Sequence, residues 1–585
     1  MDKEWPVFHV WEKVEIVLEA AKDYDNPYEE VDVWVDLMGP NFQKRIYGFW
    51  DGGNVFKVRL VAPEPGEWRW VSGSNQQDPG LNGRQGKFVA VEWTEEEKLE
   101  NPCRRGFLRP SSNGHALEYA DGTPCFLLGD AWWAAATFRF KWYDDDLERP
   151  VGPEMGFKDM VRFRKRQGFN AIALIAALPN WANDGRLHFI RMSDGTGVRD
   201  AWRHGDTEYA KDVHNEGGRP FLFPGKVPGY EDVFPDVTKI NPRYFQYLDR
   251  KIDFLNAQGF IPFIEVARRD CSECWKKFYK WPESYARYIQ YVFARYQANN
   301  CILSPIHFDW HALTIPSREF NEPANLVIEK YGPPPFGNLV SANASPSTLV
   351  NFGTPREAKW LSLHQIGNWR EHDYYWYLTE IFYSDPVLPA LNGEPYYPGF
   401  PDDNPPATSE EANFNCRSSM YGGFLSGAFA GYFYGAQGLW GGDIEEGARY
   451  RMWEAIQFGS ANQVRHLLTF VMVEGLRYRD LEPLADLVTP NKAGNPFGYR
   501  GWAFCARTRE KDFFLIYFEK DCPQTVVRGA IPYAAYLARW FDPERGKWFS
   551  ADPARVEADM IGRIKVPPYP SVGRDWGLAL TLLRQ

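Results

Sequence analysis

The chain has 585 residues, too many for a single hydrophobic core, so two to four domains are expected. Its net charge of -11 and its lack of a basic cluster exclude a nucleic-acid backbone as partner, and no run of about eighteen apolar residues predicts a membrane span. Apolar residues make up 44% and charged residues 24%, which excludes general disorder. The aromatic share of 16% is high, as in large all-β cores or in clefts that stack rings on sugars.

The first residues lack the basic-then-apolar layout of a signal peptide, so a cytoplasmic location is the default expectation. The eight cysteines are widely spread, and only Cys271-Ser-Glu-Cys274 is closely spaced. One such pair without a second pair or nearby histidines favours buried or idle thiols over a zinc site.

Residues 1–95 have the pattern of an all-β domain. Segments 14–18, 31–37 and 55–60 alternate between apolar and polar residues, and turns rich in Asp, Asn, Pro and Gly separate them. This spacing predicts a small β-sandwich whose last strand is 86–93, followed by a charged linker at 94–101.

Residues 102–475 alternate between strand and helix patterns, which predicts a parallel sheet and, with eight strands, a (β/α)8 TIM barrel. The expected strands are residues 126–129, 171–176, 261–266, 301–308, 339–342, 361–365, 387–393 and 430–434. The expected helices are residues 157–167, 242–258, 283–297, 374–382 and 451–468. Gly168 and Gly259 directly follow two of them, where a left-handed C-cap is expected.

The stretch 180–239 follows the second strand and would therefore lie on the catalytic face of the barrel. It is polar, rich in Gly and Pro, and contains Trp181, Trp202, Tyr209, Phe221 and Phe223. Long loops of this kind are usually functional or disordered, and the aromatic residues favour a wall of a substrate cleft.

Residues 476–585 return to a β pattern, with strands expected at 501–507, 512–518, 536–541 and 577–583. Segment 540–548 is typical of a hairpin with its turn at 542–546. The fold class expected is therefore a central (β/α)8 barrel flanked by N-terminal and C-terminal β-sandwich domains.

Two acidic residues stand at the ends of predicted barrel strands. Glu394 ends the apolar run before Pro395, and Asp309 closes the fourth strand, so both are expected at the C-terminal face. Glycoside hydrolysis requires two carboxyl groups in different protonation states. We therefore predict Glu394 and Asp309 as catalytic residues, the alternative for each being a helix cap or a structural ion pair.

A third acid, Glu322, lies in Asn321-Glu-Pro323, which matches the Asn-Glu-Pro at the acid/base position of many barrel glycosidases. The residues before it do not form an apolar strand, and those after it look helical. Proline at the first helical position after a polar cap is ordinary at a helix start. The pattern favours capping, with Glu322 as the alternative acid.

Other polar and aromatic residues follow the predicted strands and are candidates for substrate binding, since their convergence on one face is unlike chance. They are Asp130, Trp132, Trp133, Asn180, His307, His311, His364, Trp369, Tyr396, Gln437 and Trp440. His307 and His311 flank Asp309, but no third metal ligand is evident, so we expect neither a metal nor a cofactor.

Three segments resemble the apiosidase-type barrel glycoside hydrolases: Phe126-Leu-Leu-Gly-Asp-Ala-Trp-Trp133, Leu391-Asn-Gly-Glu-Pro-Tyr-Tyr397 and Gly427-Ala-Phe-Ala-Gly-Tyr-Phe-Tyr-Gly-Ala-Gln-Gly-Leu-Trp440. The N-terminal sandwich resembles the domain commonly placed before that barrel. The resemblance implies a retaining acid pair at strands four and seven, which falls on Asp309 and Glu394. Relatives tend to have Gly-Gly-Asp at strand four, where this chain has Ile306-His-Phe-Asp-Trp310.

The expected function is hydrolysis of O-glycosidic bonds in a plant or bacterial oligo- or polysaccharide, by a retaining double displacement with Glu394 as nucleophile and Asp309 as acid/base. The alternatives are a non-catalytic carbohydrate-binding barrel and a polysaccharide lyase, which needs a Lys, Tyr or Arg base. The partner expected is a carbohydrate, with neither nucleic acid nor membrane, and the sequence allows a homo-oligomer.

Overall fold

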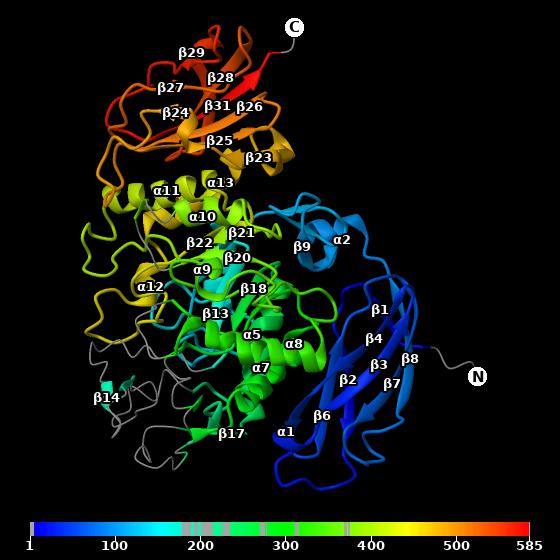
Figure 1. Cartoon of the computed structure of the whole chain (residues 1–585). Coiled ribbons are helices and arrows are strands. Elements are labelled where there is room, and N and C mark those ends of the chain that lie inside the picture. Colours follow the sequence, from blue (N-terminus) through cyan, green and yellow to red (C-terminus); the bar gives the residue numbers. More distant parts are fainter. Residues whose placement is uncertain are drawn as a thin grey trace.

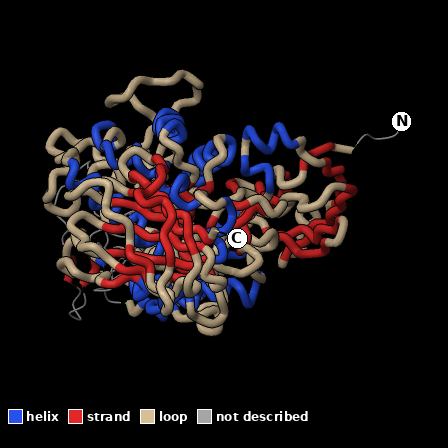
Figure 2. The backbone as a smooth tube through the Cα atoms, turned by 90° about the horizontal axis from the view of Figure 1, so that it is seen from above, coloured by secondary structure: helices blue, strands red, loops and turns tan. Residues whose placement is uncertain are grey.

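The computed structural model describes residues 5–177, 189–191, 197–199, 214–223, 225, 235–269, 275–276, 278–309, 315–367, 371–372 and 375–583. A barrel occupies the centre, with the N-terminal strands beside it and the C-terminal strands stacked on its helices (Figure 1). Seen from above, the N-terminal strands project to one side, and the C-terminus lies over the middle of the molecule (Figure 2). In the described part of the chain, every helix is too short or too polar to cross a lipid bilayer.

The N-terminal domain is a sandwich of a five-stranded sheet, in the order β1-β8-β7-β3-β4, and a three-stranded sheet, in the order β2-β6-β5. In β2 the buried residues Val14, Ile16 and Leu18 alternate with exposed ones, and they share a core with Val33 and Val35 of the other sheet. The strand period of two therefore produces this domain as predicted. The strands are β1 (Val7–His9), β2 (Val14–Glu19), β3 (Val33–Gly39), β4 (Phe42–Tyr47), β5 (Phe49–Gly52), β6 (Val55–Leu60), β7 (Gly66–Ser74) and β8 (Gln85–Val91), with α1 (Pro27–Glu30) inserted and α2 (Glu95–Glu100) following.

The central sheet has seven parallel strands in the order β19-β18-β13-β12-β22-β21-β20. They are β12 (Leu127–Ala131), β13 (Ala171–Ile175), β18 (Ile261–Glu265), β19 (Ile302–Ser304), β20 (His364–Ile366), β21 (Ala390–Asn392) and β22 (Gly431–Tyr434).

The predicted fifth strand, 339–342, is reduced to a single bridge between Leu303 and Val340. The backbone N–H groups of Leu303 and Ser341 bond to the carbonyl oxygens of Leu339 and Leu303, at 2.9 and 3.0 Å. On the other side the Leu363 N–H donates to Val340 O at 3.1 Å. This segment therefore joins the two edges of the sheet and completes an eight-part barrel.

The barrel interior is a packed core. In β13, Ala171, Ala173 and Ile175 face the interior, while Ile172 and Leu174 face the surrounding helices. Gly129 also faces inward, where a Cβ would lie 2.4 Å from the Phe433 ring. A small antiparallel sheet contributes to the same interior cluster; its strands are β9 (Leu108–Pro110), β10 (Leu117–Tyr119) and β11 (Pro124–Cys125), preceded by the 3-10 helix η1 (Pro102–Arg105).

The helices form the outer layer. They are α3 (Phe157–Arg166), α5 (Pro242–Ala257), α7 (Glu283–Tyr296), α8 (Asn321–Tyr331), α9 (Thr348–Phe352), α10 (Tyr375–Phe382), α11 (Glu410–Leu425), α12 (Met452–Ala455) and α13 (Gly459–Val471). Gly168 and Gly259 have φ values of 91° and 82°, as the C-cap prediction requires. The prediction of one continuous helix at 451–468 was wrong, because this segment forms two helices, α12 and α13.

The sequence did not predict α11. Every residue from Phe414 to Leu425 is buried, so the helix has no polar face and no amphipathic period. Gly422 and Gly423, poor helix formers, are needed there because a Cβ would meet the Tyr375 ring at 2.9 Å and the Asn392 amide at 2.6 Å.

The C-terminal domain has a six-stranded sheet, in the order β23-β25-β26-β31-β28-β29, and a three-stranded sheet, in the order β24-β27-β30. In β26, Phe513, Leu515 and Tyr517 join the core of the barrel helices, while Phe514, Ile516 and Phe518 join the sandwich core. The predicted hairpin is confirmed by the pairing of Phe541 with Trp548. The strands are β23 (Leu481–Pro483), β24 (Val488–Thr489), β25 (Ala503–Thr508), β26 (Phe513–Phe518), β27 (Val526–Val527), β28 (Ala535–Asp542), β29 (Lys547–Glu557), β30 (Ile564–Lys565) and β31 (Trp576–Leu582).

Most of the predicted cleft wall 180–239, with Trp181, Trp202 and Tyr209, lies outside the described residues. The described pieces are β14 (Phe189–Arg191), β15 (Gly197–Arg199), β16 (Phe221–Leu222) and β17 (Asp236–Ile240). Phe221 is buried against the rings of Trp275 and Tyr288, so its role is packing.

Candidate active site

The two predicted acids meet at the C-terminal ends of strands four and seven. One nitrogen of His307 and one carboxylate oxygen each of Asp309 and Glu394 lie within 4.8 Å of one another. Asp309 and Glu394 are 7% and 5% exposed. Parallel barrel strands place their ends on one face, which brings together residues that are far apart in the chain.

A third buried acid, Glu265, supports this pair from the end of β18. Its Oε1 accepts a 2.8 Å hydrogen bond from the Asn343 N–H, and its Oε2 contacts His307 Nδ1. Burial raises the pKa of Glu265 well above its usual value; the Asn343 N–H opposes this, and the Glu394 charge adds to it. Glu265 is fully buried, whereas Asp309 and Glu394 keep a small exposed fraction.

His307 connects Glu265 to Asp309. Burial, with the charges of Arg268 and Arg269, lowers the pKa of His307 well below its usual value. Both pKa shifts favour the uncharged groups, so we expect a neutral His307 ring whose Nδ1 contacts a protonated Glu265. The other ring nitrogen, Nε2, lies 3.6 Å from Asp309 Oδ1. His307 therefore lies between Glu265 and Asp309.

Two arginines after β18 also hold Asp309. An Arg268 guanidinium nitrogen lies 3.0 Å from Oδ2, and Arg269 contacts Oδ1. Both arginines are 4% exposed. The positive charges of the two arginines offset the negative charge of the Asp309 carboxylate when no substrate is bound.

Asn343 bridges the two sides of the site. Its side-chain Nδ2 donates to Glu394 Oε2 at 2.9 Å, while its backbone N–H holds Glu265. Two glycines give the neighbouring amides room: a Cβ on Gly367 would lie 2.4 Å from Asn343 Oδ1, and one on Gly393 would lie 2.1 Å from Gln365 Oε1. The backbone before Glu394 is therefore tightly constrained.

Aromatic residues lie beside His307 and in the segments that follow strands seven and eight. The Trp133 ring centre lies 4.6 Å from that of His307, and Trp133 belongs to the interior cluster. Tyr396, two residues after Glu394, packs edge-on against Tyr499 of the C-terminal part at 5.7 Å. Trp440 contacts the ring of Phe400 at 6.2 Å.

Gln437 is half-buried, and its N–H bonds to Pro398 O. It therefore lies close to the segment that follows Tyr396.

Three predicted substrate ligands lie elsewhere, because alternate residues of a strand point to opposite faces. Asp130 forms a fully buried ion pair with Arg164 of α3 at 2.6 Å and accepts a bond from Trp132 Nε1. The ring of His364 bonds to the Thr348 hydroxyl at 2.7 Å, and burial lowers the pKa of His364 to about 4. These side chains tie strands to helices, so the substrate-binding predictions for Asp130, Trp132 and His364 are corrected.

Glu322 is exposed in the first turn of α8 and accepts a 3.2 Å bond from Trp281 Nε1. The helix begins at Asn321, and the residue before it, Phe320, makes no side-chain cap bond. Glu322 is thus an acidic first-turn residue rather than a cap. It lies in the outer helical layer, away from the cluster of Asp309 and Glu394.

Asn180, His311 and Trp369 lie outside the described residues, as do Cys271 and Cys274.

The prediction from sequence missed Glu265, Arg268, Arg269, Asn343 and Tyr499. Glu265 and Asn343 come at the ends of predicted strands three and five, the same signal that marked Glu394, and could have been found by it. Tyr499 carries no such signal, because only the packing of the C-terminal domain brings it to the site.

His307, Asp309 and Glu394 could together offer ligands to a metal ion. However, Arg268 and Arg269 already contact the same Asp309 carboxylate. A bound cation would face two positive charges, so this set of groups does not fit a metal.

Comparison with known proteins matches the family described as "Apiosidase-like, catalytic domain" to residues 111–476, more than half of the chain. Residues 7–75 match a domain family of unknown function, and residues 500–581 match a family described as "Putative collagen-binding domain of a collagenase". No curated protein sequence matches this chain.

Among solved structures, a "putative glycoside hydrolase" from Bacteroides vulgatus is similar over 99% of this chain and 100% of its own, with a TM-score of 0.64 at 16% identity. A glycoside hydrolase family 5 protein from the same organism is similar over 82% of this chain and 94% of its own, with a TM-score of 0.56 at 16% identity. At 16% identity, these similarities show a shared fold.

Proposed function

Because the chain belongs to the apiosidase-like family of catalytic domains and is a glycosidase, we propose that it hydrolyses O-glycosidic bonds of a plant or bacterial oligo- or polysaccharide by double displacement. The observation that carries the proposal is that one carboxylate oxygen of Asp309 and one of Glu394 lie within 4.8 Å of each other. Retaining glycosidases have carboxyl groups about 5–5.5 Å apart, whereas inverting enzymes need roughly 6.5–9.5 Å to admit a water.

In the first step, Glu394 attacks the anomeric carbon while Asp309 gives a proton to the leaving oxygen. The glycosidic bond breaks, and a glycosyl ester forms on Glu394. In the second step, Asp309 takes a proton from water, whose oxygen attacks the same carbon and releases Glu394. The 2.9 Å bond from Asn343 supports an ionised, correctly oriented Glu394.

The contacts of Asp309 with Arg268 and Arg269 are those of a carboxylate. The acid role therefore requires the arriving substrate to replace at least one arginine and Asp309 to take up a proton from solvent, which it then carries on the oxygen that faces the glycosidic bond. The same contacts favour one rival assignment, in which Asp309 is the nucleophile and Glu394 the acid/base.

Azide rescue distinguishes the two assignments. In Glu394→Ala, turnover of an activated aryl glycoside should fall by several orders of magnitude, and added azide should yield a glycosyl azide of inverted configuration. In Asp309→Ala, azide should yield the retained configuration. Exchanged configurations would reverse the two roles, and near-normal hydrolysis by Glu394→Ala would remove it from the mechanism.

Substrate identity needs a panel of aryl pentosides, furanosides and hexosides, followed by soluble plant and bacterial polysaccharides. On any cleaved glycoside, proton NMR should show a first-formed anomer with the configuration of the substrate. An inverted anomer would rule out double displacement.

Dialysis against EDTA should leave turnover unchanged, because the proposed steps use side chains alone.

A further inference from the structure

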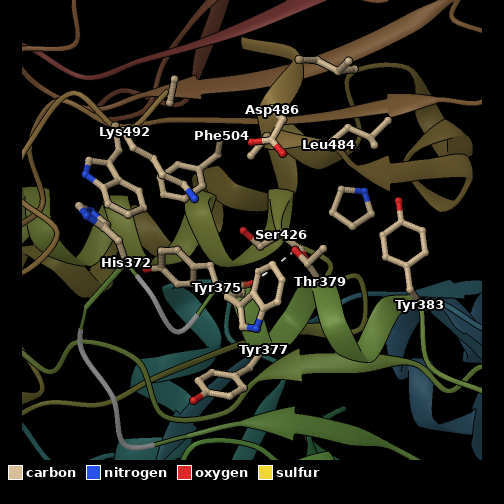
Figure 3. A pocket seen from close by; sticks show the side chains of 16 residues that line it. His372, Tyr375, Tyr377, Thr379, Tyr383, Ser426, Leu484, Asp486, Lys492 and Phe504 are labelled. Atoms are coloured by element: carbon tan, nitrogen blue, oxygen red, sulfur yellow. Dashed lines mark hydrogen bonds between the residues drawn. The ribbon is translucent and has the colours of Figure 1, made fainter. Parts of the chain in front are cut away.

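A groove separate from the acids lies between α10 and the C-terminal domain (Figure 3). Its volume is about 670 Å³, within the range of small-molecule sites. Residues of α10 form one wall, and Leu484, Asp486, Lys492 and Phe504 lie across from them. Asp309 and Glu394 are not among the residues that line it.

Two exposed aromatic residues form the α10 wall. Trp376 and Tyr383 are 68% and 58% exposed, and both line the groove. Trp376 and Thr379 lie on one face of α10, and Tyr383, the residue after its end, continues the spacing. The Cα atoms of Trp376 and Tyr383 are therefore about 10 Å apart along the axis. The buried residues of α10 are others, so packing against the barrel does not account for Trp376. Tyr383 contacts the ring of Phe382 at 5.0 Å but keeps more than half of its surface exposed. This separation along the helix suits a ligand longer than one sugar.

Hydrogen-bonding groups accompany the rings. Trp502 is 7% exposed and lines the groove, and its Nε1 has no hydrogen-bond partner among the described residues. The Thr379 hydroxyl donates to Ser426 O at 3.1 Å, which leaves its own lone pairs able to accept (Figure 3). A buried indole N–H normally finds a partner, whereas this one is unpaired within the described part of the chain, beneath the surface of the groove.

The charge of the groove favours a neutral ligand. Asp486 and Lys492 carry opposite charges, and His372 is the other ionisable side chain among the lining residues apart from tyrosines. The net charge of -11 repels acidic polymers over the whole molecule.

We propose that this groove is a second carbohydrate-binding site, which holds a segment of a neutral polysaccharide against Trp376 and Tyr383. A series of ring contacts links it to the acids. Tyr396 packs on Tyr499 at 5.7 Å, Tyr499 on His372 at 5.2 Å, and His372 on Trp502 at 4.1 Å. One polysaccharide chain can thus be held beside the face on which it is cut; only this coupling rests on the proposed function.

Binding is tested apart from catalysis, in the Glu394→Gln background, by native gel electrophoresis in arabinoxylan, arabinan, galactomannan or polygalacturonate. We expect at least one of the three neutral polymers to retard the protein. Adding Trp376→Ala and Tyr383→Ala should weaken that retardation at least about tenfold, as loss of a hot-spot aromatic does. Tyr533→Ala removes a ring that is 74% exposed and does not line the groove, so it should change nothing. Melting temperatures of all variants check folding, and Trp376→Phe should restore part of the binding.

Several results would overturn the proposal: no retardation by any neutral polymer, retardation that persists in the double variant, or retardation by polygalacturonate alone. A dimer that the double variant converts to a monomer in sedimentation would instead make the groove an interface between copies. With Glu394 restored, the double variant should cleave an aryl glycoside normally but show a raised KM on the polymer that it binds weakly. Loss of cleavage with intact binding would count against the proposed function alone.

Discussion

Glu265, Asp309 and Glu394 have the same functional group but different neighbours. Glu265 is sealed against His307 and the Asn343 N–H, Asp309 contacts two arginines, and Glu394 accepts from the Asn343 amide. The environments distinguish Glu265, which is fully buried, from Asp309 and Glu394, the two acids that we propose as catalytic. Differences of this kind are how one site holds carboxyl groups in different protonation states.

The acid/base assignment predicts a leaving-group effect. Asp309→Asn should lower kcat/KM most for glycosides with poor leaving groups, because activated aryl groups depart without a proton. Glu322→Gln should keep kcat/KM for every leaving group, since Glu322 is exposed on α8. The Glu322→Gln variant should lower the free energy of unfolding by at most about 0.3–1 kcal/mol, because it removes a negative charge from the N-terminal turn of the helix. Steady-state kinetics on a series of leaving groups tests the acid/base assignment. A leaving-group dependence of kcat/KM seen only in Glu322→Gln would assign the acid/base role to Glu322.

The Glu265–His307 pair predicts opposite pH effects on stability. The folded-state pKa of His307 lies below its unfolded value, so its contribution is present above about pH 6.5 and is lost as pH falls. The folded-state pKa of Glu265 lies above its unfolded value, so its contribution is full at low pH and is lost as pH rises.

Melting temperatures from pH 5 to 6.5 should show these opposite slopes relative to wild type. Glu265→Gln should gain stability as pH rises, and His307→Asn should lose it. Each slope is at most about 1.4 kcal/mol per pH unit. Parallel slopes for the two variants would contradict the assignment of a neutral pair.

At the scale of elements, the barrel strands place small residues where an opposite ring fills the interior. Phe433 of β22 occupies the space in front of Gly129 of β12, and Phe263 of β18 packs edge-on against it at 6.2 Å. Glycine is a poor strand former, but no larger side chain fits in front of the Phe433 ring, which explains a glycine inside a central strand. Trp133, two residues after β12, contacts His307, so this packing also affects the position of a ring beside the candidate site.

Gly129→Ala should therefore overpack the interior, since its Cβ would fall 2.4 Å from the Phe433 ring. We expect a loss of about 1–3 kcal/mol, seen as a lower urea midpoint. Gly447→Ala is the matched control, because nothing lies within 4 Å of its Cβ, and it should leave the midpoint unchanged. Equal midpoints for the two variants would mean that Phe433 moves aside freely.

At the scale of the whole molecule, buried charges join the domains. Asp249 of α5 accepts from Arg59 of the N-terminal sandwich at 2.7 Å and from Arg295 of α7 at 2.8 and 2.7 Å. Arg295 also reaches Asp51 in the sandwich at 2.8 Å. On the opposite side, Arg417 of α11 forms a two-bond pair with Asp575. Such pairs fix the geometry between domains more than they add net stability.

Asp249→Asn should destabilise the protein by about 3–5 kcal/mol, because two buried guanidinium groups lose their counter-charge. Burial alone would raise the pKa of Asp249, but Arg295 and Arg59 hold it well below the usual range. The contribution of Asp249 to the free energy of unfolding is therefore present above about pH 4 and is lost as pH falls further.

Thermal unfolding at pH 7 measures this loss, and the gap between variant and wild type should narrow below pH 4. Asp36→Asn is the control, since its 2.8 Å pair with Arg45 is about half exposed and should matter little. A loss no larger than that of Asp36→Asn would show that the interface does not depend on the pair.

The sequence by itself determined the three-part architecture, most strand and helix positions, and the two acids at strand ends. These follow from local signals: alternation, helical periodicity, glycine caps and polar residues that close apolar runs. It failed where local signals are absent, as in α11, whose buried surface leaves no amphipathic pattern, and in the fifth strand, which is reduced to one bridge.

Only the tertiary structure decided which polar side chains share the site. Asp130 and His364 end predicted strands as Glu394 does, yet they turn outward to Arg164 and Thr348, because facing depends on register in the closed barrel. Partners such as Tyr499 reach the site through packing between segments more than a hundred residues apart, and no local pattern encodes that contact. Local interactions select elements, whereas burial against distant segments selects the chemistry that those elements carry.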